Sequence, residues 1–405
     1  MIKNDAVLLG LLLATLGVIF WTTQSAHPFW QRFYRYVPAL LLCYFVPALY
    51  NTFGLIDGEH SQLYFVSSRY LLPAILVLLT LATDLPATLR LGPKALALFL
   101  TASLGVVLGG PVALLIWKLI APQTVDAELW RGMTAIAGSW IGGAANQAAM
   151  KEVFHIDANV FGVMVAVDVL ISYLWMAVLL WMAAKHRAID ARLGADSSAI
   201  ATLAERMERF RKEHARIPSL AELMFILGLA FGATGLAHAL GVPLAAVFKG
   251  AQWAERLSLA SDFFWIVVLA TTFGLVLSFT PARNLEGAGA SKIGTALLYV
   301  MIATIGMQMN VRALLTNPTL FGIGFTWIAF HAVLLIVVAR VLRAPSFFLA
   351  VGSQANIGGP ASAPIVAAAF HPALAPVGVL LAVLGYALGT YGGWLTGQLM
   401  RLVSQ

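Results

Sequence analysis

Twelve apolar segments constrain the fold of this chain more than any other feature. Most are close to the roughly 20 residues that an α-helix needs to cross a bilayer. Their apolar residues are continuous rather than alternating, which excludes a transmembrane β-barrel. Because 60% of the 405 residues are hydrophobic and only 11% are charged, the sequence predicts an all-α polytopic membrane protein. The segments lie near residues 6–24, 36–54, 69–83, 95–120, 132–150, 158–183, 219–247, 260–280, 290–309, 318–342, 346–369 and 373–400.

One long polar stretch divides these segments into two sets of six. The stretch from Lys185 to Ser219 is rich in Arg and Lys, which favours a cytoplasmic location, and residues 198–215 have the pattern of an amphipathic surface helix. We therefore predict a first membrane repeat over residues 1–183, a basic cytoplasmic linker over 184–218 and a second membrane repeat over 219–405. The net charge of +7 is typical of basic loops beside anionic lipid, and we expect no nucleic-acid partner.

Residues 141–167 and 357–383 align without a gap at a shift of 216 residues. Ten of the 27 aligned positions are identical, including an Ile-Gly-Gly run and a Phe-His pair. Small apolar residues inflate such matches, but these two runs are harder to obtain by chance. The alignment indicates an internal duplication, which is common among membrane transporters.

The charges of the loops predict how each repeat crosses the membrane. If the segment at 132–150 crossed fully, the basic Lys185–Ser219 stretch would lie outside, against the positive-inside rule. A re-entrant hairpin at 132–150, and another at 346–369, removes the conflict. Each repeat then has five spans and one re-entrant or broken helix, about ten spans and two hairpins in all, and both termini are external. Since five is odd, the two repeats have opposite orientations in the membrane. The scheme places three basic residues, Lys249, Arg256 and Arg312, on the external side, which counts against it.

Glycine pairs interrupt both predicted hairpins, at Gly142–Gly143 and Gly358–Gly359. Non-helical backbone is tolerated at membrane depth only where it is buried or lines a cavity, and glycine permits such a break. Amide and hydroxyl groups flank both pairs and suit alkali cations or carboxylates. We predict that these segments bind solute and ion, with small-residue helix packing as the alternative. The flanking candidates are Ser139, Asn146 and Gln147 in the first half and Ser353, Gln354, Asn356 and Ser362 in the second.

Asp168 is a carboxylate in the middle of an apolar segment. Such a group costs about 2.5–3.5 kcal/mol on insertion scales, so it must face the protein interior and find a partner. We predict that Asp168 carries or senses the coupling ion, a proton or a sodium ion, with Asn146 and Asn356 as further sodium ligands. The alternatives are an internal ion pair or a neutral, hydrogen-bonded acid. Its counterpart at the 216-residue shift is Leu384, so the predicted site is asymmetric.

Lys151 and Glu152 follow the first glycine-pair segment. We expect them to form a solvated pair at the membrane surface or to gate the cavity that the hairpin encloses. No other metal or cofactor is predicted, because the chain has a single cysteine, Cys43, and cannot build a cysteine-based metal site.

The motifs GSWIGGAANQAAM (138–150) and GSQANIGGPASAP (352–364), with Asp168 one helix after the first, resemble those of the YjcL-like bacterial integral membrane proteins. The resemblance covers most of the chain. That family looks distantly related to sodium–glutamate symporters, 2-hydroxycarboxylate transporters and cation/proton antiporters, which combine two inverted five-helix repeats with a moving transport domain and a scaffold that often dimerises. The resemblance implies an elevator-like transporter of the bacterial inner membrane and a homodimer.

The sequence lacks the motifs H-E-x-x-H, G-x-S-x-G and G-x-x-x-x-G-K-[ST], so we expect no enzyme and no ATP-binding loop. The leading hypothesis is a sodium- or proton-coupled symporter for a small organic anion or amino acid. A cation/proton antiporter is the alternative, although Val167 precedes Asp168 where such antiporters often carry a second acid or Asn. A non-transporting receptor or assembly protein that uses the basic linker is a third hypothesis.

Overall fold

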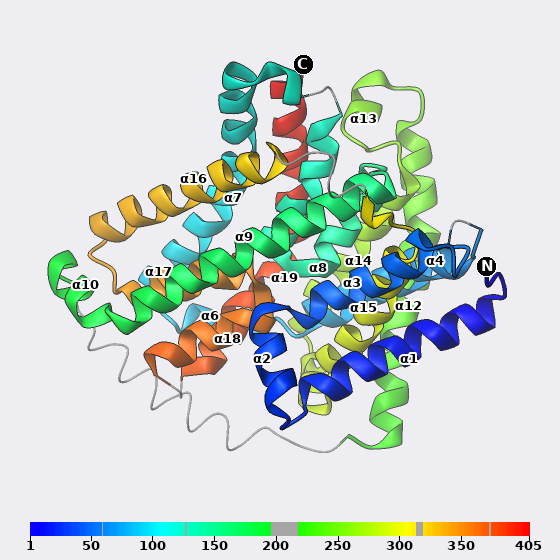
Figure 1. Ribbon diagram of the computed structural model, residues 1–405, viewed down its shortest axis with the longest axis horizontal. Helices are drawn as coiled ribbons and strands as arrows, with labels where there is room; N and C mark the ends of the chain where they lie inside the picture. The colour runs from blue at the N-terminus through cyan, green and yellow to red at the C-terminus, as the bar shows by residue number, and fades with distance from the viewer. Residues whose placement is uncertain (59, 126–127, 196–217, 313–318, 372–373) are drawn as a thin grey trace.

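The computed structural model describes residues 1–58, 60–125, 128–195, 218–312, 319–371 and 374–405 (Figure 1). Their secondary structure is helical apart from one isolated bridge between Ile2 and Ile56, which confirms the all-α prediction. The helices are α1 (Asp5–Thr23), α2 (Pro28–Tyr36), α3 (Ala39–Thr52), α4 (Leu63–Val66), α5 (Leu72–Leu81), α6 (Leu85–Leu89), α7 (Pro93–Ile120), α8 (Leu129–Val153), α9 (Ala158–Ala184), α10 (His186–Leu193), α12 (Leu220–Phe248), α13 (Gln252–Arg256), α14 (Asp262–Ser278), α15 (Ala290–Gly306), α16 (Thr319–Val341), α17 (Ser346–Ile357), α18 (Gly359–Phe370) and α19 (Ala375–Ser404). A π-helix, Ser67–Leu71, joins α4 to α5, and 3-10 helices cover Pro122–Thr124 and Pro281–Ala288.

Seven of the described helical segments are long and apolar enough to cross a membrane, and up to nine if each of two bent pairs counts as one span. The bent pairs are α2 with α3, at 90°, and α14 with the following 3-10 helix, at 95°. Pro38 and Pro281 lie at these bends, and proline cannot donate the backbone hydrogen bond that would continue a helix. The sequence predicted about ten spans; bent pairs and the short helix α15 account for the lower count.

The helices pack into two bundles, each built from both halves of the chain. Bundle A, on the right in Figure 1, contains α1, α3, α5, α12, α14 and α15. Bundle B contains α7, α8, α9, α16, α17, α18 and α19. The two bundles meet mainly where α5 and α14 contact α8 and α19. The polar candidates of the sequence therefore all belong to bundle B.

Helix α8 folds back on itself as a helical hairpin, which we call hairpin 1. Its backbone leaves helical geometry at Gly142 and at Gly143, whose φ of 73° and ψ of −175° are adopted essentially by glycine alone. Arg131, in the first turn, donates from Nη1 to the carbonyl oxygen of Phe154 at 3.1 Å. The rings of Trp130 and Phe154 lie 5.6 Å apart. The two ends of α8 therefore lie side by side, whereas a straight helix of this length would separate them by more than 30 Å.

Helices α17 and α18 form a second hairpin, hairpin 2, around Gly358 and Gly359. Gly359 has a φ of 60°, in the left-handed region that favours glycine. At the base, the rings of Phe347 and Phe370 meet edge to face at 5.4 Å. Phe370 is the counterpart of Phe154 at the 216-residue shift, so an equivalent phenylalanine closes each hairpin.

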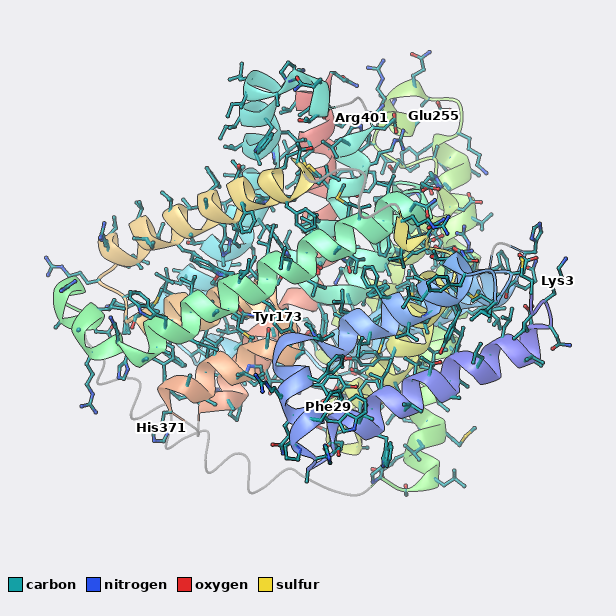
Figure 2. The ribbon with its side chains drawn as sticks, in the orientation of Figure 1. Lys3, Phe29, Tyr173, Glu255, His371 and Arg401 are labelled. Carbon is teal, nitrogen blue, oxygen red and sulfur yellow. The ribbon has the colours of Figure 1, made fainter. Side chains whose placement is uncertain are left out.

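The bases of the two hairpins lie at opposite ends of α9. Helix α9 begins shortly after hairpin 1 ends, and Asp157 caps its first turn. At the other end, His186 of α10 contacts Phe370 at 5.6 Å between ring centroids, and Asp190 accepts a hydrogen bond from the Ser346 amide at 2.7 Å. In Figure 2, His371 at hairpin 2 and Arg401 near hairpin 1 accordingly lie far apart. The hairpins therefore open toward opposite ends of bundle B.

The tips of both hairpins approach α19 at Gly385. A Cβ atom at this position would lie 2.6 Å from the carbonyl oxygen of Ile141 and 3.7 Å from that of Ala355. Both carbonyls come from the last turn before a glycine pair. The absence of a side chain at Gly385 thus lets the two breaks approach the same point of α19.

The described part of the linker contains α10, which packs against α9 and α17. The amphipathic helix predicted near residues 198–215 lies outside the described residues.

Candidate functional site

Asp168 lies in the middle of α9, 5% exposed, with its carboxylate directed at hairpin 1. Each carboxylate oxygen accepts two side-chain hydrogen bonds, so neutral donors alone surround the charge. Hydrogen bonding of this kind offsets the cost of burying a carboxylate. The donors are Ser139 Oγ at 2.6 Å and Gln147 Nε2 at 2.9 Å, both to Oδ2, and Trp140 Nε1 at 2.7 Å and Ser172 Oγ at 3.0 Å, both to Oδ1.

The surroundings of Asp168 bear on one of the alternatives left open by the sequence, the internal ion pair. Among the residues that the structure describes, no lysine, arginine or histidine forms a salt bridge with Asp168. An internal ion pair is therefore not what holds this carboxylate. Its donors come from both arms of hairpin 1, Ser139 and Trp140 before the glycine pair and Gln147 after it, so the carboxylate ties the two arms together.

Gln147 extends this network toward bundle A. While its Nε2 donates to Asp168, its Oε1 accepts a long hydrogen bond of 3.5 Å from the hydroxyl of Tyr44 on α3. Tyr44 is fully buried. A change in the charge of Asp168 would therefore alter the hydrogen bonding of Gln147, which also contacts Tyr44 at the boundary between the bundles.

Asn146 faces away from Asp168, toward α19. Its Nδ2 donates to the carbonyl oxygens of Gly142 at 2.9 Å and Tyr386 at 3.2 Å. Its Oδ1 accepts from Thr390 at 2.6 Å. A Cβ at Gly389 would lie 2.6 Å from Gly142 Cα, so small residues on both helices allow this close approach. Asn146 therefore holds the tip of hairpin 1 against α19.

Asn356 has the corresponding role in hairpin 2, toward α7. It donates to the carbonyl oxygens of Gly352 at 3.0 Å and Phe99 at 3.3 Å, and it accepts from Ser103 at 2.7 Å. Both asparagines thus bond the carbonyl oxygen four residues earlier in their own hairpin and a carbonyl oxygen of a neighbouring helix.

Ser353 belongs to a separate buried set. Its hydroxyl accepts from Trp175 Nε1 at 2.8 Å and lies 2.8 Å from His331 Nε2. His331 is fully buried. This contact links α9, α16 and α17.

Gln354 and Ser362 bridge the tip of hairpin 2. Gln354 Nε2 donates to Ser362 Oγ at 2.7 Å. Gln354 Oε1 is buried and has no hydrogen-bond partner within the described part of the chain. A buried amide oxygen without a donor costs about 1–3 kcal/mol, and it is a suitable ligand for a cation or for a donor group of a solute.

The three predicted sodium ligands have different partners in this arrangement. Asp168 bonds to hairpin 1 and α9, Asn146 to hairpin 1 and α19, and Asn356 to hairpin 2 and α7. They share no partner among the described hydrogen bonds. No group of three or more His, Cys, Asp or Glu residues that could hold a metal occurs within the described ranges.

Lys151 and Glu152 form a buried cluster with two residues of bundle A, Tyr64 and Arg69. Glu152 lies 3.7 Å from Lys151 Nζ and 3.6 Å from Arg69 Nη2. The Tyr64 hydroxyl donates to Glu152 and accepts from Lys151. Lys151 is 6% and Glu152 9% exposed, so the pair is not the solvated one that the sequence allowed; it joins hairpin 1 to bundle A.

A family model described as "Protein of unknown function (DUF819)" matches residues 10–403. The chain belongs to this family. It is also similar to a protein of Bacillus subtilis (strain 168) described as "Uncharacterized membrane protein YjcL", with 26% identity over 362 residues and 86% of each chain covered. These matches confirm the resemblance to YjcL-like proteins and, with the apolar helices, a multi-pass membrane protein.

In this DUF819 chain, the sequence predicted the hairpin residues better than their partners. Ser139, Gln147 and Asp168 do come together. Trp140 was missed, although a buried indole N–H needs an acceptor and this one lies within the polar motif. Thr390 and Ser103, which receive the two asparagines, carry no signal in the sequence because isolated hydroxyl residues are common in membrane helices.

Proposed function

We propose that this chain is a secondary active transporter that couples a sodium or proton gradient to the movement of a small organic solute, an organic anion or an amino acid. The observation that carries the proposal is the pair of helical hairpins that open toward opposite ends of α9 and approach α19 at the same point, beside a buried carboxylate. An ion and a solute that bind at such tips can be reached from either side in turn.

The proposed membrane arrangement has two inverted repeats, and each repeat has five spans and one re-entrant hairpin. Contacts between the ends of α7 and its neighbours support it. Lys94, at the start of α7, donates to the carbonyl oxygen of Arg343 just after α16, so α7 and α16 run in opposite directions. Lys118, at the end of α7, donates to Val403 near the end of α19. Since the basic linker lies at the hairpin 2 end, that end would face the cytoplasm of a bacterial inner membrane.

The chemistry of the tips suits both an ion and a solute. In each hairpin the first arm ends at the tip with the carbonyl end of a helix, and the second arm begins there with the amide end of a helix. Carbonyl ends favour cations and amide ends favour anions. Gln354 Oε1 adds an unpartnered acceptor. We assign coupling to Asp168, because binding of a proton or a sodium ion there changes the charge that four donors hold in place.

An elevator-like movement of bundle B against bundle A would carry this site across the membrane. A cavity of about 350 Å³ separates α3 from α9 and α16 and is lined by apolar side chains such as Phe45 and Leu170. Tyr173, near the middle of α9 in Figure 2, also lines it. The apolar part of the boundary can slide at low cost, whereas the Tyr44–Gln147 hydrogen bond and the Arg69–Glu152 ion pair would have to break. A homodimer formed through bundle A would provide the fixed frame.

The proposal is tested first by finding the solute and then by transport. Purified protein is screened by thermal shift against amino acids, dicarboxylates and sugars with and without sodium, since a ligand of the native state raises its apparent stability. Uptake of the hit is then measured in proteoliposomes with imposed sodium or proton gradients. We expect Asp168→Asn to abolish gradient-driven accumulation while solute counterflow remains.

Asp157→Asn is the matched control, because it makes the same chemical change on the same helix and asparagine also caps helices well. Accumulation by Asp168→Asn at the wild-type level would remove Asp168 from coupling. No uptake or counterflow of any thermal-shift ligand would contradict the transporter proposal.

The cation/proton antiporter is kept as a second candidate because Asp168 forms no salt bridge with a described lysine, arginine or histidine, so that an exchanged cation would meet no competing charge there. It predicts that an imposed sodium gradient moves protons without an organic solute. A non-transporting receptor predicts instead that deletion of the linker abolishes function and that tip substitutions are silent.

A further inference from the structure

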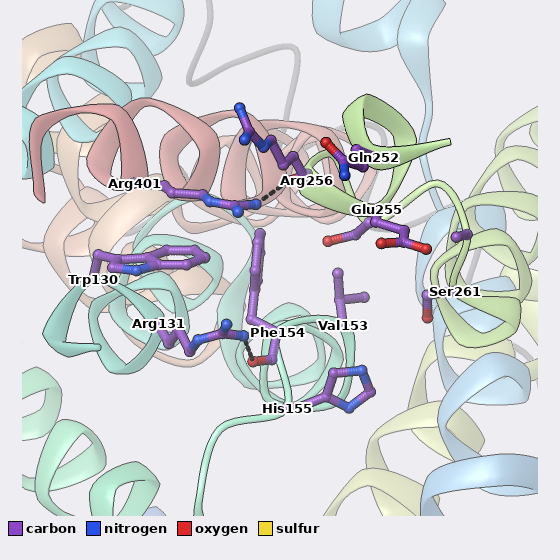
Figure 3. Close-up of a pocket in the computed structure, with 12 residues that line it drawn as sticks. Trp130, Arg131, Val153, Phe154, His155, Gln252, Glu255, Arg256, Ser261 and Arg401 are labelled. Carbon is purple, nitrogen blue, oxygen red and sulfur yellow. Dashed lines mark hydrogen bonds between the residues drawn. The ribbon is translucent and has the colours of Figure 1, made fainter. Parts of the chain in front are cut away.

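A second cavity, of about 610 Å³, lies between the bundles at the end where hairpin 1 opens (Figure 3). Bundle B contributes both ends of hairpin 1 and the last turns of α19. The connection between α12 and α14 contributes the opposite wall. We call it the arginine cavity and define it by Trp130, Arg131, His155, Glu255, Arg256 and Arg401.

The three arginines come from three different elements. Hydrogen bonds and ring contacts hold the guanidinium groups of Arg131 and Arg401 in place, but carboxylates do not neutralise all three charges. Arg131 pairs with Glu128 and donates to the Phe154 carbonyl oxygen. Arg401 donates to the backbone oxygen of Arg256. The guanidinium carbons of Arg131 and Arg401 lie 5.0 Å and 5.7 Å from the Trp130 ring. Stacking on an indole holds a guanidinium in place but leaves its charge available.

Positive charge exceeds negative charge around this space. Arg131 and Arg256 are close enough to act on Arg401 as like charges, and Glu128 acts on it as the countercharge. Neither Arg256 nor Arg401 has a carboxylate salt-bridge partner in the described ranges. Glu255 is the one carboxylate on the wall itself, and Figure 3 shows it across the cavity from Arg131 and Trp130.

We propose that the arginine cavity binds a small oxyanion, a carboxylate or a phosphate. Guanidinium groups recognise these oxyanions through paired hydrogen bonds, and an anion among the three arginines would relieve their mutual repulsion. The hydroxyls of Ser258 and Ser261 and the amide of Gln252 line the same space and supply further donors. The site is independent of whether the chain transports a solute, and the oxyanion could belong to a soluble molecule or to a lipid headgroup.

The first test is an anion titration of the purified full chain in a neutral detergent. Sodium succinate and sodium phosphate are compared with sodium chloride at matched ionic strength, by thermal unfolding and calorimetry. We expect a saturable rise in the unfolding midpoint with succinate or phosphate and not with chloride. Arg256→Gln and Arg401→Gln should each raise the Kd of the oxyanion by about tenfold or more.

Two further variants separate binding from general damage. Arg340→Gln removes the same charge at the far end of α16, exposed and outside the cavity, and should leave the titration unchanged. Glu255→Gln removes the opposing charge from the wall and should tighten binding several-fold, a gain that misfolding cannot produce.

The source of the oxyanion is distinguished in nanodiscs of phosphatidylcholine with or without phosphatidylglycerol. If the phosphate of an anionic lipid fills the site, phosphatidylglycerol should suppress the succinate response of the wild type; if not, the response is the same in both discs. Identical curves for succinate, phosphate and chloride in detergent, or unchanged affinity in both arginine variants, would overturn the proposal.

Discussion

Hairpin 1 and hairpin 2 turn at glycine pairs and close at equivalent phenylalanines, Phe154 and Phe370, yet the groups around them differ in charge. Both arms of hairpin 1 bond the carboxylate of Asp168, and the last turn of hairpin 1 forms a buried ion cluster with bundle A. Hairpin 2 has only neutral groups at its tip, Gln354 with Ser362 and Asn356 with Ser103. The comparison shows that the two hairpins share their turns and their closing phenylalanines but differ in charge, with a carboxylate at hairpin 1 and neutral groups at hairpin 2.

The largest effect on stability is expected when the carboxylate that hairpin 1 bonds is replaced by the residue at the equivalent position of the second half. Asp168→Leu introduces the residue found at the equivalent position, Leu384, and leaves four buried donors without an acceptor. We expect the free energy of unfolding to fall by roughly 3 kcal/mol or more, since each unpaired buried group costs about 1–3 kcal/mol. Thermal and denaturant unfolding in detergent measure this, with Asp157→Asn as the control. Wild-type stability of Asp168→Leu would mean that the carboxylate does not hold hairpin 1 together.

The next effect concerns the ion cluster that hairpin 2 lacks. Glu152→Gln keeps the shape of the side chain but removes the carboxylate that lies within 4 Å of both Lys151 and Arg69. Breaking a buried pair typically costs about 3–5 kcal/mol. Arg69 is one-third exposed, so we expect the lower part of that range or less. The same assay with Glu286→Gln, a carboxylate bonded only to Ser291, is the comparison. An equal or smaller loss for Glu152→Gln would show that the cluster is not a specific link to bundle A.

The smallest effects are expected at the turns themselves. Gly143→Ala forces a side chain into a backbone region that is nearly restricted to glycine and should cost about 2 kcal/mol. Gly359→Ala meets no atom within 4 Å, so only its positive φ opposes the change, at about 1 kcal/mol. Gly235→Ala, in open space within α12, should be neutral or slightly stabilising. A cost at Gly235 equal to that at Gly143 would refute the special role of the turns.

The sequence predicted the hairpins because their signals are local. A glycine pair within an apolar segment, repeated at a shift of 216 residues, requires no knowledge of neighbouring helices. The burial of Asp168 followed from the cost of charge in a membrane, whereas its hydrogen bonds with Ser139 and Gln147 were found only in the structure. The number of spans was harder to predict. The chain bends at Pro38 and at Pro281, and apolar composition alone does not reveal such bends.

The partners of the two asparagines could not be predicted from the sequence. We predicted Asn146 and Asn356 as sodium ligands. In the structure each bonds a carbonyl oxygen of a different neighbouring helix, α19 for Asn146 and α7 for Asn356. Which helix lies next to a break depends on packing between residues more than 200 positions apart, and no local pattern encodes it.

The most direct test of the central claim is the sidedness of the two hairpin bases. His155 and His371 are equivalent at the 216-residue shift, and both are exposed. Because Cys43 is the single cysteine, His155→Cys and His371→Cys can each be placed in a Cys43→Ala chain and labelled with a membrane-impermeant maleimide in right-side-out and inside-out vesicles. The account predicts labelling of position 155 from outside and of position 371 from inside. Labelling of both positions from the same side would contradict it.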